Sequence, residues 1–367
     1  MLKFNKTLKS MAVILAVSSL ALTGCGRAET PAATGSGSAA AGFAADSLIG
    51  VALPQKTSEN WVLAEKLFND GLATAGFKAD VQFANGGVSE QQNQISAMVT
   101  KGAKVIIVGA IDGAQLGTQL KQAKDAGATV IAYDRLLLNT KDVDYYVAYD
   151  NFKVGELQGQ ALLDGMKAKK PTGPYNIELF AGSPDDANAK VFFDGAMKVL
   201  QPKIDDGTVV VASGQKSFEQ AVTQGWKAEN AQKRMDSLLV GNYSSAELDG
   251  VLSPNDTLAR AILTSVKAAG KANPTVTGQD AEVESVKSIM AGVQYSTINK
   301  DTTALVQHAI QMAKDLQAGK TPEINDPTSY NNGVKVVPAF LLVPQIVTKA
   351  NAAEQFANDK VLGPLTK

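Results

Sequence analysis

Apolar residues along this chain follow two patterns, which alternate from Ser47 onward. Short runs rich in β-branched residues are followed by stretches in which apolar positions recur every three or four residues. The short runs predict buried strands, and the longer stretches predict amphipathic helices. Their alternation is typical of an α/β fold, in which helices cover both faces of a parallel sheet. The strands predicted in the first half are residues 48–53, 81–84, 105–110, 129–133 and 145–149.

A second cycle of the same pattern predicts strands at residues 176–180, 209–212, 250–252 and 275–277. The chain therefore contains two similar α/β units in tandem. A further strand is predicted at 294–298 and a helix at 302–319. We interpret residues 325–344, which are rich in Asn, Pro and Tyr, as a return crossing between the units.

These elements predict a two-lobed α/β protein, with one parallel sheet in each lobe and a hinge made of several chain crossings. We assign residues 47–150 and 281–325 to the N-terminal lobe, and residues 151–280 and 326–367 to the C-terminal lobe. About 320 residues follow the N-terminal segments, which is enough for two domains that each have a core.

The first 24 residues have the character of a secretory signal. Lys3, Lys6 and Lys9 precede an apolar run at 11–22, which is too short for a typical membrane span. We therefore expect residues 1–24 to be removed during export.

The run Leu22-Thr23-Gly24-Cys25 resembles the bacterial lipobox, in which the cysteine is acylated and becomes the new N-terminus. Cys25 is the only cysteine of the chain, so no intrachain disulfide can form. A lone cysteine is often just a small buried apolar residue, but its place directly after an apolar signal favours lipidation. Residues 25–46 are mostly small or polar and predict a flexible tether to a membrane.

Charge and composition exclude several classes of function. The formal charge is −1 for the whole chain and −4 once the three signal lysines are removed, so no basic field exists to attract nucleic acid. The single histidine argues against imidazole-based catalysis and against a histidine-rich metal site. We expect neither a cofactor nor a metal.

Polar side chains gather where the predicted strands end. Ligands of open α/β sheets bind beyond the carboxyl ends of the strands, so these side chains are candidates for a binding site. They are Gln55, Lys56, Asn60, Trp61, Asn85, Asp112, Asp134, Arg135, Asp185, Asp186, Asn188, Gln215, Trp226, Asn255, Asp256, Gln279, Asp280, Asn299 and Lys300.

The mixture of carboxylates, cations, amides and tryptophans favours a neutral polyhydroxylated ligand such as a sugar. Each sugar hydroxyl both donates and accepts, and Asp134 beside Arg135 supplies an acceptor and a fork of donors. Trp61 and Trp226 follow strands of different lobes and can cover the two faces of one sugar ring. The alternative is that each tryptophan only anchors a core.

Several candidates also have a purely local explanation. Asn255 or Asp256 can serve only as a helix N-cap, and Asp112 can serve only in a turn. Asp185 and Asp186 can mark nothing more than a helix start, where carboxylates are favoured by the helix dipole.

Seven motifs, in the same order along residues 47–348, resemble those of xylose-binding and multiple-monosaccharide-binding proteins of ABC sugar importers. They are LPQK at 53–56 followed by Trp61, AYDR at 132–135, YDNF at 149–152, ELFAGSPDD at 178–186, SPND at 253–256, GQDAE at 278–282 and NGVKVVP at 332–338.

The resemblance implies a type I periplasmic-binding-protein fold that closes on an aldose such as xylose, glucose, galactose or arabinose. It implies delivery to an ABC permease and its ATPase by an extracytoplasmic, lipid-anchored monomer. It places the ligand contacts at Trp61, Asp134, Arg135, Asn188, Trp226, Asn255, Asp280 and Lys300.

Asp186 and Lys190 are weaker candidates, because they match positions used in related glucose/galactose-binding proteins. Asn60 stands where the family usually has Arg, and Ala187 stands where it tends to have Asn. Losing a cation and an amide can change the preference among sugars, so the preferred sugar stays open.

Two other functions compete with sugar delivery. An enzyme acting on sugars would use an Asp pair as acid and base, but each candidate Asp lies beside a cation or amide that we expect to keep it ionised. A sugar receptor for chemotaxis or signalling would need the same binding site, so sequence does not separate it from an importer component. A repressor of related fold is excluded by the signal and by the lack of a DNA-binding headpiece.

Overall fold

The computed structural model describes residues 42–56 and 58–367. The predicted signal at 1–24, the lipidation site Cys25 and residues 25–41 of the tether lie outside them. Within the described part, no helix combines the length and the apolar character needed to span a bilayer.

The first sheet has six strands, all parallel, in the order β11-β5-β4-β3-β1-β2. Four of its strands were predicted to within two residues, and β2 begins three residues before its predicted start. The strands are β1 (Leu48–Leu53), β2 (Lys78–Phe83), β3 (Val105–Val108), β4 (Thr129–Tyr133), β5 (Tyr145–Tyr149) and β11 (Ala339–Leu342).

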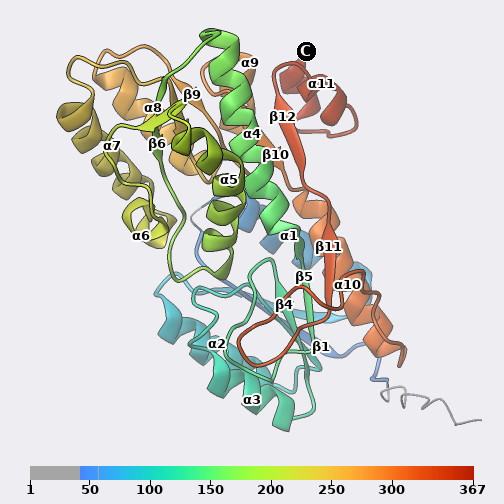
Figure 1. Ribbon diagram of the computed structural model, residues 1–367. Coiled ribbons are helices and arrows are strands. Elements are labelled where there is room, and N and C mark those ends of the chain that lie inside the picture. The colour runs from blue at the N-terminus through green and yellow to red at the C-terminus, as the bar shows by residue number, and fades with distance from the viewer. Residues whose placement is uncertain (1–41, 57) are drawn as a thin grey trace, which may run out of the picture. The chain divides into compact units, whose positions relative to one another are not determined.

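Helices cover both faces of this sheet, which explains why its central strands are continuous apolar runs. Helices α1 (Glu59–Thr74) and α10 (Thr302–Gln317) share one apolar core with the sheet. Helices α2 (Val88–Thr100) and α3 (Gly117–Asp125) share the other. The predicted α/β fold class is therefore confirmed for this lobe (Figure 1).

The second sheet repeats the design with four parallel strands in the order β7-β6-β8-β9. Helices α4 and α5 pack on one face and helices α7 and α8 on the other. Its elements are β6 (Tyr175–Leu179), β7 (Val209–Val211), β8 (Gly250–Leu252), β9 (Thr275–Val276), α4 (Asn151–Lys169), α5 (Ala187–Asp205), α6 (Phe218–Ala221), the 3-10 turn η1 (Gln224–Trp226), α7 (Ala228–Asn242) and α8 (Asp256–Ala268).

Within the described residues, the chain crosses between the two sheets three times: between β5 and α4, between β10 (Ser296–Asn299) and α10, and between β11 and β12 (Gln345–Thr348). Strands β10 and β12 pair in antiparallel fashion beside the second sheet. The crossings lie together, because the Tyr149 hydroxyl donates to the Asp301 carbonyl at 3.0 Å and the Asp150 N–H donates to the Leu342 carbonyl at 3.1 Å.

Two segments pack differently from the predicted lobe boundaries. Strand β11 joins the first sheet beside β5, although residues 326–367 were assigned to the second lobe. Helix α9 (Val283–Met290) packs against Val347 and the C-terminal segment of the second lobe, although residues 281–325 were assigned to the first. The remaining elements are α11 (Ala352–Gln355) and η2 (Gly363–Thr366).

We therefore use "first lobe" for residues 42–149 and 302–342, and "second lobe" for residues 151–300 and 345–367. The apolar run of β11 explains the first difference, because it covers the edge of β5 that would otherwise stay open.

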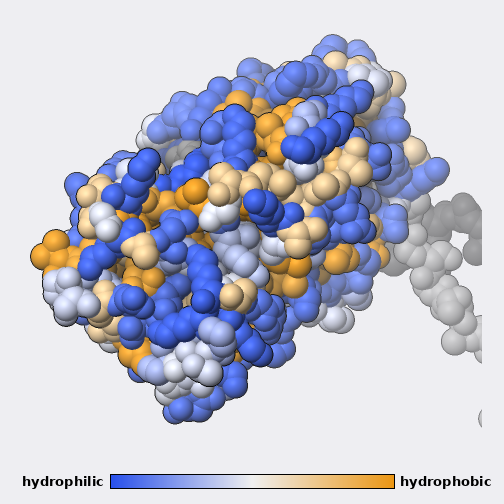
Figure 2. Space-filling model, turned by 90° about the horizontal axis from the view of Figure 1, so that it is seen from above, coloured by the Kyte–Doolittle hydropathy of each residue, from blue (hydrophilic) through white to orange (hydrophobic). Residues whose placement is uncertain are grey.

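Figure 2 shows that hydrophilic residues cover most of one face of the molecule, with small apolar groups between them.

Candidate functional site

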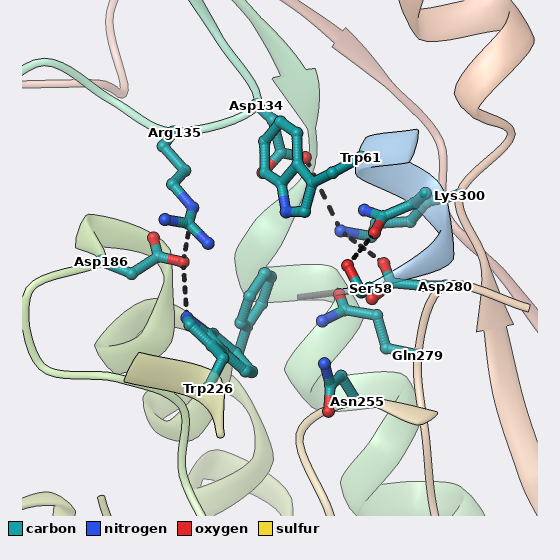
Figure 3. A pocket seen from close by; sticks show the side chains of 12 residues that line it. Ser58, Trp61, Asp134, Arg135, Asp186, Trp226, Asn255, Gln279, Asp280 and Lys300 are labelled. Atoms are coloured by element: carbon teal, nitrogen blue, oxygen red, sulfur yellow. Dashed lines mark hydrogen bonds and ion pairs between the residues drawn. The ribbon is translucent and has the colours of Figure 1, made fainter. Parts of the chain in front are cut away.

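A cavity lies between the lobes, at the carboxyl ends of both sheets. It contains about 360 Å³ of space free of protein atoms, including its mouth. Figure 3 shows side chains from both lobes pointing into it. The lining residues are Ser58, Asn60, Trp61, Asp134 and Arg135 from the first lobe, and Asp186, Phe192, Trp226, Asn255, Gln279, Asp280 and Lys300 from the second.

Seven of the eight predicted ligand contacts line this cavity, and Asn188 does not. The Asn188 side chain is buried, its Nδ2 donates to the Asp134 carbonyl at 2.8 Å and its Oδ1 accepts from the Tyr146 hydroxyl at 3.3 Å. Asn188 therefore supports Asp134 from the other lobe. That any of these residues touches a sugar stays a prediction.

The weaker candidates separate clearly. Asp186 lines the cavity, whereas Lys190 pairs with Asp194 on the exposed side of α5. Asp112 accepts from the Ala114 N–H at 2.9 Å, so it serves in a turn.

Two ion-pair groups connect the lobes inside the cavity. Lys300 Nζ lies 3.1 Å from Asp280 Oδ1 within the second lobe and 3.7 Å from Asp134 Oδ2 of the first. Arg135 Nε of the first lobe lies 2.9 Å from Asp186 Oδ2 of the second. All five side chains are at most 13% exposed, so water screens these charges weakly.

Burial shifts the pKa values of these groups. It raises the pKa of Asp186 and of Asp280, and the nearby cations Arg135 and Lys300 offset only part of the rise. The pKa of each of these two carboxyls is therefore higher than that of an exposed aspartate, although each carboxyl lies in an ion pair. Burial acts to lower the pKa of Lys300, but the carboxylates of Asp280 and Asp134 raise it overall.

The two tryptophans lie on different sides of the cavity (Figure 3). The Trp61 indole packs edge-on to Tyr133, and the Arg135 guanidinium lies 5.3 Å from its ring centre. The Trp226 Nε1 donates to Asp186 Oδ2 at 3.1 Å. Both indoles are mostly buried, so they build the walls of the cavity as well as parts of each core.

A glycine makes room for each indole. A Cβ on Gly109 would lie 3.1 Å from Trp61 Cζ3, and a Cβ on Gly182 would lie 2.1 Å from Trp226 Cζ2. Carbon atoms do not approach to 2.1 Å without a bond, so the position of the Trp226 ring requires glycine at 182.

Backbone strain is concentrated at the site. Asp134, Trp226 and Asp280 have φ values of 60°, 54° and 94°, in the region that side chains other than glycine rarely adopt. Such strain costs about 1–3 kcal/mol per residue and tends to occur where a binding site dictates the backbone. Three of the cavity residues therefore carry an independent sign of function.

Two amides leave polar atoms available to a ligand. The Oδ1 of Asn255 accepts from the Leu258 N–H at 3.0 Å and caps α8, while its nitrogen points toward the cavity in Figure 3. The Nε2 of Gln279 donates to the Pro254 carbonyl, and its buried Oε1 has no partner among the described residues. The N-cap role proposed for Asn255 is thus confirmed, and its amide nitrogen is still available.

Sequence reasoning missed Ser58 and Phe192 and left Gln279 among the strand-end candidates. Phe192 lies four residues after Asn188 on α5, and the Lys300 Nζ lies 5.5 Å from its ring centre. Helical spacing from the Asp-Asp-Ala-Asn segment at 185–188 could have indicated Phe192. Ser58 directly precedes α1, and its hydroxyl contacts Asn60 Oδ1.

The chemistry available to this cavity is recognition by hydrogen bonds and by flat apolar surfaces. Among residues 42–56 and 58–367, no group of three or more His, Cys, Asp or Glu side chains is arranged to hold a metal. The acceptors, the donors and the two indoles match the hydroxyls and the C–H faces of a small cyclic polyol.

Comparison with known proteins places the chain in a family. The periplasmic binding protein domain family matches residues 49–321. The multiple sugar-binding periplasmic receptor ChvE of Rhizobium radiobacter is 49% identical, over 84% of this chain and 89% of that protein. The D-xylose-binding periplasmic protein of Escherichia coli is 37% identical, over 85% and 89%.

Solved structures similar to this chain are also binding proteins. An ABC transporter solute binding protein from Clostridium phytofermentans with bound β-D-glucose superposes with a TM-score of 0.83 at 37% identity, covering 87% of this chain and 100% of that one. A carbohydrate transporter solute binding protein from Chloroflexus aurantiacus in complex with D-glucose gives 0.78 at 34% identity, covering 85% and 96%. The predicted resemblance is confirmed: the chain belongs to the periplasmic binding protein family.

Proposed function

We propose that this protein captures a monosaccharide outside the cytoplasm and delivers it to an ABC importer. The observation that carries the proposal is the cavity itself, in which both lobes contribute charged donors, charged acceptors and one indole each. Relatives named for binding several sugars or D-xylose, and solved structures with bound glucose, support the same ligand class.

Each side chain has a role in this proposal. Asp134 and Asp280 accept hydrogen bonds from sugar hydroxyls, while Arg135 and Lys300 donate to them. The Asn255 amide nitrogen donates as well. Trp61 and Trp226 lie against the faces of the ring, and Asn188 holds Asp134 from behind.

Closure of the lobes follows from the origin of these residues. A sugar contacts Asp134 and Arg135 of one lobe together with Asp280 and Lys300 of the other only when the lobes are closed. The bound sugar therefore shifts the population toward the closed form, which the permease would recognise.

We propose that the protein performs no reaction on its sugar. The carboxyls that would act as acid and base are engaged in ion pairs, Asp186 with Arg135 and Asp280 with Lys300. Incubation with each sugar should return it unchanged by NMR, and a product would contradict this proposal.

The anchor is part of the proposal. Cleavage before Cys25 and acylation of that residue would leave a monomer tethered to the outer face of the membrane. The wild-type protein should fractionate with membranes, and a Cys25→Ala variant should not be acylated. An unmodified mature protein by mass spectrometry would contradict the anchor.

A receptor in chemotaxis or signalling is the alternative. It is supported by one relative, ChvE, which is named a multiple sugar-binding periplasmic receptor. Both roles require the same cavity. Loss of sugar uptake in a deletion strain would support the importer, whereas normal uptake with lost sugar response would support the receptor.

The test of sugar binding is a thermal-shift panel with xylose, arabinose, glucose, galactose, ribose and fructose. A ligand that binds only the folded protein raises its melting temperature. One or a few sugars should raise the melting temperature in a saturable way. If the protein is folded and no sugar of the panel raises its melting temperature, monosaccharide capture is overturned.

A further inference from the structure

Two helices begin beside the cavity without a side-chain cap of their own. Helix α1 starts at Glu59, directly after Ser58 of the cavity wall, and α9 starts at Val283, three residues after Asp280. Neither N-cap residue, Ser58 for α1 or Glu282 for α9, forms a side-chain cap hydrogen bond. Unpaired N–H groups at a helix start favour a negatively charged partner.

Each helix receives that partner from the other lobe. The Val283 N–H at the start of α9 donates to Glu59 Oε2 at 2.9 Å. The Glu59 N–H at the start of α1 donates to Glu282 Oε1 at 3.2 Å. The two glutamates thus cap each other's helices across the gap between the lobes, and such charge-assisted bonds are among the stronger ones.

The two partners are held very differently. The Glu282 side chain is 1% exposed, pairs with Arg260 at 2.6 Å and accepts from Thr257 Oγ1 at 3.0 Å. Its backbone N–H donates to Asp256 Oδ2 at 2.9 Å. Glu59 is exposed, and its side chain contacts the second lobe. Glu282 is therefore fixed within the second lobe, whereas Glu59 is free to leave it.

Neither glutamate lines the cavity. We propose that Glu59 and Glu282 form a latch between the lobes that sets the affinity for the sugar without touching it. The inference rests on the proposed function, because the latch acts by stabilising the closed form that holds the ligand. An open form keeps all of the cavity side chains but loses both latch bonds, so the latch raises the closed fraction and with it the apparent affinity.

The latch also has consequences for rates. Association begins from the open lobes, where the two glutamates are apart, so the association rate should not depend on them. Dissociation requires the lobes to separate, so the latch should slow it. Most affinity changes among variants of one binding site act through the dissociation rate.

The test compares Glu59→Ala with Glu65→Ala in the full protein, using a sugar that the wild type binds. Glu65 is a second glutamate of α1, and its side chain pairs with Lys56 of the same lobe. We expect Glu59→Ala to weaken binding about three- to tenfold, through faster dissociation in stopped-flow measurements, as one lost hydrogen bond predicts. Glu59→Gln, which keeps an acceptor oxygen, should recover part of the loss.

The melting temperature of the sugar-free protein and the association rate should stay at wild-type values in all three variants, because Glu59 is not part of a core. Equal dissociation rates for Glu59→Ala and Glu65→Ala would overturn the latch while leaving sugar capture intact. Absence of sugar binding by the wild type would instead overturn the proposed function and the latch with it.

Discussion

Asp134, Trp226 and Asp280 combine a side chain in the cavity with a left-handed backbone. The surrounding structure holds them there, because the Asp134 N–H donates to the Val147 carbonyl and the Asp280 N–H donates to the Ile298 carbonyl, both at 2.9 Å. The strain fixes the direction of the side chains before any ligand arrives. A preorganised site loses less entropy on binding.

Gly182→Ala tests the position of the Trp226 indole. The new methyl group would lie 2.1 Å from Trp226 Cζ2, so the indole ring must leave its present position in the cavity wall. We expect calorimetry to show sugar affinity reduced by about tenfold or more, as for loss of a packed aromatic contact. Gly241→Ala in α7 is the control, because nothing lies within 4 Å of its Cβ position. Wild-type affinity in Gly182→Ala would contradict stacking by Trp226.

The buried Asp256 carboxyl should make stability depend on pH. Burial, reinforced by the charge of Glu282, raises its pKa well above the ordinary value of 3.8. Above about pH 4 the unfolded chain therefore loses this proton while the folded protein keeps it. The carboxyl then lowers the free energy of unfolding by up to about 1.4 kcal/mol per pH unit, until the pH passes the folded pKa.

Asp256→Asn removes that dependence, since an amide does not titrate. We expect the stability of the wild type, measured by urea unfolding, to fall relative to that of Asp256→Asn as the pH rises from about 4. Parallel curves for the two proteins would show that Asp256 titrates normally.

For single residues, the sequence pattern identified the side chains that follow strands, since the carboxyl ends of all strands in a parallel sheet lie at one edge. Asn188 does not line the cavity, because its amide bonds to Asp134 and Tyr146 of the other lobe, a packing contact with no local signature in the sequence. Its contact with a sugar stays a prediction. Phe192 was missed because it enters the cavity from helix α5, not from a strand end, and Ser58 was missed because it lies in the loop directly before α1.

Helix starts organise the crossings between the lobes. The Asp301 side chain caps α10 by accepting from the N–H groups of Thr303 at 2.8 Å and Ala304 at 3.2 Å. The Asp150 side chain caps α4 by accepting from the Lys153 N–H at 2.9 Å. Each cap lies where the chain passes from one lobe to the other, so it defines where the flexible connection ends.

Asp301→Ala should therefore reduce stability without changing the cavity. Loss of an N-cap costs about 1 kcal/mol, which urea unfolding can resolve. Asp315→Ala, in the last turn of the same helix, serves as the control, because the Asp315 side chain accepts from the Gln311 side chain and lies far from the helix start. A similar free energy of unfolding for both variants would argue against the cap.

Element prediction worked where the apolar pattern was long. All strands of both sheets except β11 were predicted, because most buried parallel strands are apolar along their whole length. Strand β11 was missed because its four residues follow a polar segment and Pro338, a context typical of a loop. The side taken by α9 was predicted wrongly, because it depends on contacts with the C-terminal residues, which have no local signature.

At the scale of the whole molecule, three crossings of the described chain join the two lobes, and both lobes line the cavity between them. The ion pair between Arg135 and Asp186, the contact of Lys300 with Asp134 and the Glu59–Glu282 latch all join the lobes. A sugar placed among these groups would bind to both lobes at once, so capture and closure become a single event.

The most direct test is calorimetric titration of the wild type, Asp134→Asn and Asp112→Asn with the sugar that stabilises the protein most. Asn tolerates the left-handed backbone at position 134, so this variant changes the charge and not the fold. We predict one saturable site per chain, affinity at least about tenfold weaker in Asp134→Asn, and no change for the turn residue Asp112. Absence of saturable binding, or equal affinity in Asp134→Asn and wild type, would contradict sugar capture in this cavity.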